Sequence, residues 1–279
     1  MNGWYRSWNW AGKAPKVHVA PRPANCTAPC SHGRPGKARL GAAAPPGPAA
    51  ILLRRRRGAF TVACVSYRYW PLFDLGLSTP GLRLRPMTEA DLGPIADLLP
   101  DDVEQDPGPA EYGVGDARVS RGIVSHQSYW RAYGTWRPRA WRLPFVVRTT
   151  AGDIIGVQEL EGDDFPALRT VDTSSFLVTT ARGRGLGKQM RTAVLALAFG
   201  PLEAEAAITS AWHDNHASLG VSRALGYRPN GEMLHAHPGR VDVLKHMRLL
   251  RAAWLASGLG DQVQITGFDA CRPLFGQPG

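Results

Sequence analysis

The sequence predicts a mixed α/β (α+β) domain over residues 65–260, with an N-terminal extension before it and a short tail, residues 261–279, after it. Short apolar runs bounded by turn residues predict strands, and longer segments with apolar residues every three or four positions predict helices. These segments follow the order βααβββαβαββ, which is typical of a sheet covered by helices. A hydrophobic share of 44% in 279 residues is enough for a sizeable core.

Residues 1–64 differ in composition from the rest of the chain. They contain 11 Lys and Arg residues and no Asp or Glu, whereas the remainder has 22 basic and 23 acidic residues. The stretch 42–50 is rich in Ala and Pro, 54–57 is four arginines, and no apolar periodicity is sustained. We expect this extension to be disordered, or the protein to start near Val65. The net charge of +10 therefore belongs to the extension and not to the domain.

The four cysteines predict neither a disulfide framework nor a metal site. Cys26, Cys30 and Cys64 precede the domain, and Cys271 stands alone near the C-terminus. Cys26, Cys30 and His32 offer at most three ligands, which we interpret as a chance cluster, and no metal is expected. The lack of a disulfide framework fits a reducing cytoplasm, which is the expected location. No apolar run approaches the ~20 residues that span a bilayer, so we expect a soluble protein that does not enter a membrane.

Cap and turn residues divide the domain into its elements. Thr88 is a good helix N-cap, Pro100 ends that helix, Gly152 with Asp153 marks a hairpin turn, and Gly226 suits the end of a later helix. The expected elements are a strand at 82–85, a helix at 88–99, a loop at 100–118, a helix at 119–133, strands at 144–148, 154–160 and 171–179, a helix after residue 187, a strand at 206–212, a helix at 215–225, and strands at 232–236 and 241–249.

A glycine-rich turn, Arg182-Gly-Arg-Gly-Leu-Gly-Lys188, lies between a predicted strand and a helix whose inner face has Met190, Val194, Leu197 and Ala198. Glycines let the backbone turn tightly and point several N–H groups at one place, and the helix start adds partial positive charge. The spacing fits neither the P-loop nor the G-x-G-x-x-G dinucleotide fingerprint. The turn therefore indicates a pyrophosphate site of another kind, unless it only begins the helix.

The spacing Arg182-x-x-Gly185-x-Gly187 resembles the coenzyme A motif of the GNAT superfamily of N-acetyltransferases, Gln/Arg-x-x-Gly-x-Gly/Ala. Further along, Asn215-x-x-Ser218, followed by Leu225-Gly-Tyr227 and Gly231, resembles the second GNAT motif in its ribosomal-protein-alanine acetyltransferase (RimJ/RimL-like) form. The resemblance covers about residues 82–250. It implies the GNAT fold, a mixed and mostly antiparallel sheet flanked by helices, with acetyl-CoA as cosubstrate.

The same resemblance implies three contact regions for the cosubstrate. The pantetheine arm would lie along the strand end formed by Phe176, Leu177, Val178 and Thr179, where this strand separates from the one that ends at Trp212. The pyrophosphate would lie on Arg182, Gly183, Arg184, Gly185, Leu186, Gly187 and Lys188. Asn215, Ser218 and Ser222 stand at i, i+3 and i+7 on one helix stripe, which would face the thioester.

The general acid is the uncertain member of this site. Many GNAT enzymes have a Tyr at the position of Ser222, and this Tyr protonates the leaving thiolate. The present chain lacks the Tyr. Ser218 is then the better candidate for the acid, as the resemblance to the RimL-like branch implies. The other interpretation of Ser218 is an ordinary serine in the first helical turn, and Ser222 or water remain open as the proton source.

On the acceptor side, the amine must lose a proton before it can attack. Glu159, on the central strand, is the candidate that receives this proton directly or through water, and the competing interpretation is a solvated carboxylate. His213 and His237 are further candidates. An aromatic group either lines the acceptor pocket or packs a helix onto the sheet. Its members are Tyr129, Trp130, Tyr133, Trp136 and Trp141.

The predicted function is transfer of an acetyl group from acetyl-CoA to a primary amine in a ternary complex. The acceptor is either a protein N-terminal α-amine or a small-molecule amine, and a homodimer is an open alternative to a monomer. Nucleic acid is not an expected partner, because the basic residues are not interleaved with aromatic ones. Two other functions stay open: acyl-CoA binding without catalysis, and nucleic-acid binding through the basic arm.

Overall fold

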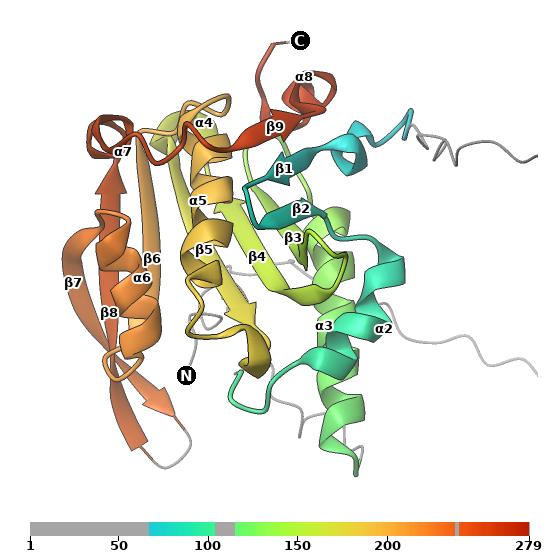
Figure 1. Ribbon diagram of the computed structural model, residues 1–279, viewed down its shortest axis with the longest axis vertical. Coiled ribbons are helices and arrows are strands. Elements are labelled where there is room, and N and C mark those ends of the chain that lie inside the picture. The colour runs from blue at the N-terminus through green and yellow to red at the C-terminus, as the bar shows by residue number, and fades with distance from the viewer. Residues whose placement is uncertain (1–66, 104–114, 238–239, 279) are drawn as a thin grey trace, which may run out of the picture. The chain divides into compact units, whose positions relative to one another are not determined.

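The computed structural model describes residues 67–103, 115–237 and 240–278, without the side chains of 236–240. The extension 1–64, with Cys26, Cys30, His32 and Cys64, lies outside the described residues. In the described part, nine strands form one sheet in the order β7-β8-β6-β5-β4-β3-β2-β1-β9 (Figure 1). The strands are β1 (Gly76–Ser78), β2 (Leu82–Pro86), β3 (Trp141–Thr149), β4 (Ile154–Gly162), β5 (Thr170–Leu177), β6 (Ala206–Trp212), β7 (Arg228–His237), β8 (Arg240–Leu250) and β9 (Gln264–Thr266).

Neighbouring strands are antiparallel except β5 and β6, which pair in parallel. This is the mixed, mostly antiparallel sheet of the predicted fold class, which is confirmed. The α-helices are α2 (Glu89–Leu98), α3 (Ala117–Gly134), α4 (Phe165–Leu168), α5 (Leu186–Phe199), α6 (His216–Ala224), α7 (Arg251–Ser257) and α8 (Phe268–Cys271). Short 3₁₀ turns occur at η1 (Pro71–Asp74), η3 (Thr179–Ala181) and η4 (Arg272–Phe275).

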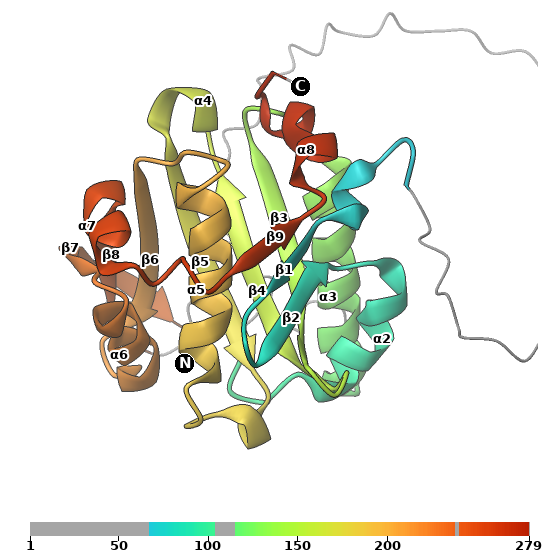
Figure 2. The same cartoon turned by 45° about the horizontal axis from the view of Figure 1, so that its top comes forward.

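Helices cover both faces of the sheet. Helix α5 lies across one face with α6 and α7 beside it, and α2 and α3 pack together on the other face (Figure 2). Each face has its own apolar cluster, a large one around α5 and a smaller one around α2 that includes Val146, Val157 and Phe176 of the sheet. No helix in these described segments has both the length and the apolar character needed to cross a bilayer.

Helix α5 is buried more completely than its sequence predicted. We expected one inner face, whereas every residue from Met190 to Phe199 is buried. The reason is that α5 contacts the sheet on one side and α6 and α7 on others, so solvent reaches little of it. One consequence is that Arg191 is also buried, at 4% exposure.

The C-terminal residues differ from the predicted tail. Strand β9 pairs with β1 at the edge of the sheet, and Phe268, Cys271 and Phe275 are buried in the larger cluster. The Trp136 side chain donates a hydrogen bond from Nε1 to the Leu274 carbonyl, at 2.8 Å. Burial raises the pKa of the Cys271 thiol to about 12. Residues 261–278 therefore complete the domain, which does not end at residue 260.

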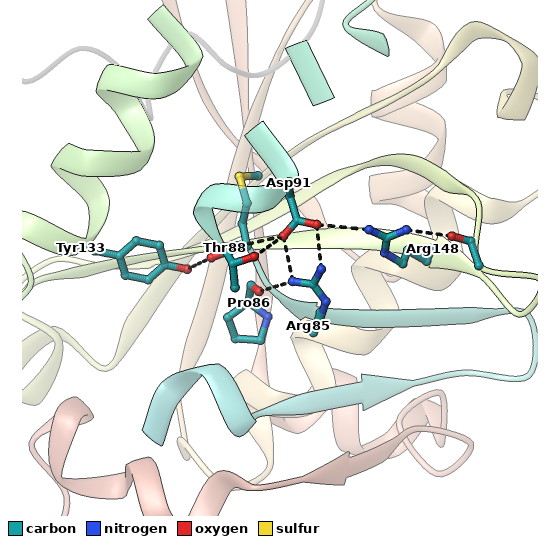
Figure 3. A network of polar contacts seen from close by, with 8 residues as sticks. Arg85, Pro86, Thr88, Asp91, Tyr133 and Arg148 are labelled. Carbon is teal, nitrogen blue, oxygen red and sulfur yellow. Dashed lines mark hydrogen bonds and ion pairs between the residues drawn. The ribbon is translucent and has the colours of Figure 1, made fainter. Parts of the chain in front are cut away.

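A buried carboxylate fixes the start of α2. Asp91, 2% exposed, accepts two hydrogen bonds from Arg85, at 2.7 and 2.8 Å, and one from Arg148 at 3.1 Å (Figure 3). It also accepts from the amide and hydroxyl of the N-cap Thr88, both at 2.9 Å. Burial raises the pKa of Asp91, but the hydrogen bonds from Arg85 and Thr88 outweigh it and hold the pKa below its ordinary value. The network ties α2 to β2 and β3.

We expect Asp91→Asn to lower the free energy of unfolding by about 2–3 kcal/mol, because hydrogen bonds to charged groups contribute about 1.5–3 kcal/mol. The folded pKa of Asp91 lies below its unfolded value near 3.8, so its stabilisation is present above that pH and is lost as the pH falls through the folded pKa. Denaturant unfolding at pH 7 and pH 3 measures both effects. Asp97→Asn on the same helix, whose pair with Arg118 is exposed, should cost less than about 1 kcal/mol. Equal losses in the two variants would contradict this role of Asp91.

Candidate active site

The two parallel strands separate soon after they pair. Strands β5 and β6 pair only at Thr170–Ala206, Val171–Ala207 and Asp172–Ile208. Beyond these pairs β5 continues along β4 as far as Leu177, so one edge of its last residues has no β6 partner. At the vertex, the Thr209 hydroxyl donates to the Thr173 carbonyl at 2.9 Å. This separation lies where Phe176 and Leu177 were predicted to meet the pantetheine arm, and Val178 and Thr179 follow at the end of the strand.

The glycine-rich turn adopts a backbone that favours glycine. Gly183 and Gly185 have φ angles of +72° and +75°, and Gly185 is the N-cap of α5. Apart from the chain neighbours, no atom of the described residues lies within 4 Å of a Cβ placed on either glycine, so the space in front of the turn is open. The amides of Leu186 and Gly187 begin α5 and have no acceptor further up the helix. The turn thus has the open, N–H-lined form that a phosphate group needs.

The charged side chains of this turn divide into two kinds. Arg182 donates to both carboxylate oxygens of Asp102, at 2.6 and 2.8 Å, and its Nε donates to the Leu177 carbonyl at 3.1 Å. These bonds lower the pKa of Asp102. Arg182 thus holds the turn against the end of β5. Arg184 and Lys188 have no ion-pair partner in the described part of the chain, which leaves them as the cations beside the open space.

The three residues of the predicted α6 stripe have different surroundings. The Asn215 side chain caps α6 by accepting from the Ser218 amide at 3.0 Å. Ser222 is 1% exposed; its hydroxyl donates to the Ser218 carbonyl at 3.0 Å and accepts from Arg191 Nη1 at 2.8 Å. Ser218 itself is half-buried, and its hydroxyl has no hydrogen-bond partner among the described residues. Of the two serines, Ser218 alone therefore has a hydroxyl that is not already engaged.

Arg191 was not predicted as a site residue, although its position in the helix could have indicated it. Its position follows Gly187 by four residues and precedes Val194 by three, so it shares the stripe that α5 turns inward. Burial of a charged residue on an apolar helix stripe is unfavourable because the charge loses water, so such a residue is a candidate for a functional role.

Glu159 lies on the opposite face of the sheet, toward α2 and α3. It is 5% exposed, its Oε2 accepts from the Ser174 hydroxyl at 3.2 Å, and its Oε1 lies 3.8 Å from Arg142 Nε. Arg142 also donates to Glu161 at 2.9 and 3.1 Å. Burial raises the pKa of Glu161 to about 8. Arg142 therefore lies between the two carboxylates, with its hydrogen bonds to Glu161 and a longer ion pair to Glu159.

A small apolar pocket lies against Glu159. It is bounded by α2, α3 and the sheet, with Met87, Ile95 and Phe176 among its apolar walls, and Glu159 is the charged side chain that lines it. Its volume is about 30 Å³, and a water molecule needs about 10–15 Å³, so water fits beside the carboxylate. The Ser128 hydroxyl lines the pocket, is buried, and has no hydrogen-bond partner among the described residues. Sequence reasoning missed Ser128 because a helical serine has no distinguishing pattern.

The predicted aromatic group does not form a single wall. Tyr129 lines the pocket, Trp130 is 53% exposed, and the Tyr133 hydroxyl donates to the Met87 carbonyl at 2.9 Å. Trp136 and Trp141 stack and are buried in the larger cluster. The group therefore serves mainly to pack α3 and β3, the second of the two roles considered.

The two histidines considered as bases are less well placed. His213 is about half exposed, and its Nδ1 lies 2.7 Å from Asp242 Oδ1. The side chain of His237 lies outside what the structure describes. Neither histidine lines the pocket beside Glu159.

The fold also occurs in solved acetyltransferases. A chimera of the spermidine N-acetyltransferase SpeG from Vibrio cholerae and hSSAT matches with a TM-score of 0.50 and 18% identity, covering 62% of this chain and 98% of that one. The dodecameric structure of the spermidine N-acetyltransferase from Vibrio cholerae in an intermediate state matches with a TM-score of 0.50 and 17% identity, covering 63% and 97%. At these identities the likeness concerns the fold.

The sequence itself matches a family over the region that carries the separated strands, the glycine turn and α6. Residues 81–228, more than half of the chain, match the family described as acetyltransferase (GNAT) domain. This protein therefore belongs to the GNAT acetyltransferase family.

Proposed function

We propose that the protein transfers an acetyl group from acetyl-CoA to a primary amine by direct attack in a ternary complex. The observation that carries the proposal is the separation of β5 and β6, which begins at the vertex beside Thr173 and opens toward the glycine turn at the start of α5. The N-x-x-S residues at the start of α6 and the L-G-Y residues that follow it support the RimJ/RimL-like branch. An α-amine at a protein N-terminus and a small-molecule amine both remain candidate acceptors.

The residues at the turn fit a pyrophosphate. The space before Gly183 and Gly185 is open, and Arg184 and Lys188 stand beside it. Residues Phe176 to Thr179 would hold the pantetheine arm along the edge of β5 that β6 leaves, as an added strand would. Acetyl-CoA supplies the acetyl group as a thioester, and Ser218 is the residue that would donate a hydrogen bond to the sulfur as it leaves.

Glu159 is the proposed proton acceptor. The Ser174 hydroxyl connects its carboxylate with β5, the strand that borders the separation, and the pocket has room for a bridging water. Removing a proton from an amine at pH 7 costs about 4.6 kcal/mol for a lysine side chain and about 1 kcal/mol for an α-amine. A single buried carboxylate therefore suits an α-amine better than a lysine.

Glu159→Gln should lower kcat/KM at pH 7 by about 100-fold, because a positioned base typically contributes 10²–10⁴-fold. The loss of kcat/KM should become smaller as the pH approaches the pKa of the amine, because more of the amine is then already deprotonated in solution and needs no base. The measurement is the pH dependence of kcat/KM for Glu159→Gln. Glu161→Gln, which removes the next carboxylate on the same face, is the control. A defect that does not change with pH would argue that Glu159 positions the acceptor and takes no proton.

The proposal as a whole is tested by a panel of acceptors. An N-terminal alanine peptide, spermidine, lysine and an apolar monoamine are each mixed with acetyl-CoA and the full chain, and thiol release is followed. We expect release that depends on at least one amine. Binding of acetyl-CoA without thiol release for any amine would favour acyl-CoA binding without catalysis. Binding of nucleic acid that depends on residues 1–64 would favour the nucleic-acid-binding alternative.

A further inference from the structure

Arg191 is a buried charge that has no ion-pair partner among the described residues. It lies on α5, 4% exposed, and no Asp or Glu of the described residues is within ion-pair distance. Its Nη1 donates to the Ser222 hydroxyl at 2.8 Å, and its buried Nε has no hydrogen-bond partner in the described part of the chain. Burial lowers the pKa of Arg191, while its electrostatic interactions with Tyr227 and Asp172 act in the opposite direction.

Burial of a guanidinium in this position has a large desolvation cost. Removing a charge from water costs several kcal/mol, and the Ser222 hydroxyl and the charge of Asp172, which lies beyond ion-pair distance, return only part of that. A methionine would fill a similar volume without the cost. A buried arginine without an ion-pair partner is expected where a negative charge arrives from a ligand or develops during a reaction.

The contacts of Arg191 place it beside the vertex of the separated strands. Ser222, its partner, accepts at its carbonyl from the Tyr227 amide at 3.0 Å. The Tyr227 hydroxyl lies 3.4 Å from the Thr173 hydroxyl, and Thr173 is the residue at which β5 and β6 part. An arm that starts at the glycine turn and runs along the free edge of β5 ends at this vertex. The reacting end of an arm bound in this way would lie on the side of the vertex where Ser222 and Arg191 are buried.

We propose that Arg191 stabilises the negative charge on the coenzyme A sulfur as the thioester breaks. The inference rests on the proposed function. The amine nitrogen bonds to the carbonyl carbon, its proton passes to Glu159, and the carbon–sulfur bond breaks with the electron pair on sulfur. Arg191 balances that charge through space, Ser218 donates a hydrogen bond, and water later returns a proton. Ser222 stands where many GNAT enzymes have a Tyr, so a fixed positive charge would replace a proton donor.

The test measures the pKa of the coenzyme A thiol bound to the full chain. Thiolate absorbance against pH gives this value for the parent and for Arg191→Met and Arg191→Lys. A positive charge close to a thiol lowers its pKa by about one to three pH units. We expect the parent to lower the thiol pKa, Arg191→Met to return it toward that of free coenzyme A, and Arg191→Lys to keep most of the decrease. The kcat of Arg191→Met should fall by about 10–1000-fold.

A structural role predicts a different pattern. If Arg191 only supports the fold, Arg191→Met should melt at a lower temperature, whereas the proposal expects an equal or higher melting temperature. Arg251→Met is the matched control, because Arg251 also has a buried nitrogen without a partner but lies on α7. Its thiol pKa and kcat should equal those of the parent. Should Arg191→Met fail to fold, Arg191→Gln supplies a second neutral variant.

The outcomes separate this inference from the proposed function. A parent that binds no acetyl-CoA refutes the proposed function and the inference with it. A parent that transfers acetyl groups, with an unchanged thiol pKa in the neutral variants, overturns the role of Arg191 alone. An unchanged thiol pKa together with a raised KM for the acceptor would mean that Arg191 binds an anionic group of the acceptor, which also overturns it.

Discussion

Gly185→Asp is expected to weaken coenzyme A binding by at least about 100-fold, or about 2.7 kcal/mol, while the domain remains folded. The substitution places a carboxylate in the open space before the first amides of α5, where the phosphates are expected. It repels the ligand and blocks its approach. The φ angle of +75° adds roughly 1–2 kcal/mol of backbone strain, which the domain should tolerate.

The control for this strain is Gly152→Asp. Gly152 has a φ angle of +103° in the exposed turn between β3 and β4, and no atom lies within 4 Å of an added Cβ. Gly152→Asp therefore introduces a comparable backbone strain at a position away from the candidate site. Calorimetric titration with coenzyme A should show parent-like binding for Gly152→Asp. Parent-like binding in Gly185→Asp as well would move the phosphate site elsewhere.

Ser218→Ala is expected to lower kcat by 10²–10⁴-fold with little change in coenzyme A affinity, because a positioned proton or hydrogen-bond donor contributes about that much. Ser218 is half-buried, and its hydroxyl is not engaged by the described residues. Its loss should therefore leave the fold intact. Steady-state kinetics at saturating acetyl-CoA measures the change.

Ser222→Ala is the companion variant. Its kcat should stay within several-fold of the parent, because the Ser222 hydroxyl is already bonded to Arg191 and to the Ser218 carbonyl. The same contacts mean that its loss should destabilise the fold by about 1–2 kcal/mol, since Arg191 loses a buried acceptor. A large kcat loss in Ser222→Ala with a normal Ser218→Ala would reverse the two roles. Normal rates in both would assign protonation of the sulfur to water.

Much of the fold follows from local signals in the sequence. The hairpin around Gly152, the helix that begins after Thr88 and the end of α6 at Gly226 appear where cap and turn residues predicted them. These signals act over a few residues, so the sequence shows them directly. Strands β1 and β9 escaped prediction because each has only three residues, and their pairing joins Leu77 with Ile265 across the length of the domain.

The candidate site was predictable to a similar degree. The glycine turn was visible because positive φ angles require particular residues, as at Gly185. The bonds of Arg182 to Asp102 and of Arg191 to Ser222 were not visible, because each joins two elements whose relative placement only the folded sheet defines. Glu159 could be placed on a strand, but its burial beside Arg142 and Ser174 depends on three strands in register.

Amide hydrogen exchange with and without acetyl-CoA tests the central claim, the location of the cosubstrate between β5, the glycine turn and α6. The account predicts slower exchange in peptides that cover residues 176–188 and 215–222, and unchanged exchange at the β3–β4 turn around Gly152. Saturable binding of acetyl-CoA that leaves exchange of residues 176–188 unchanged would contradict it.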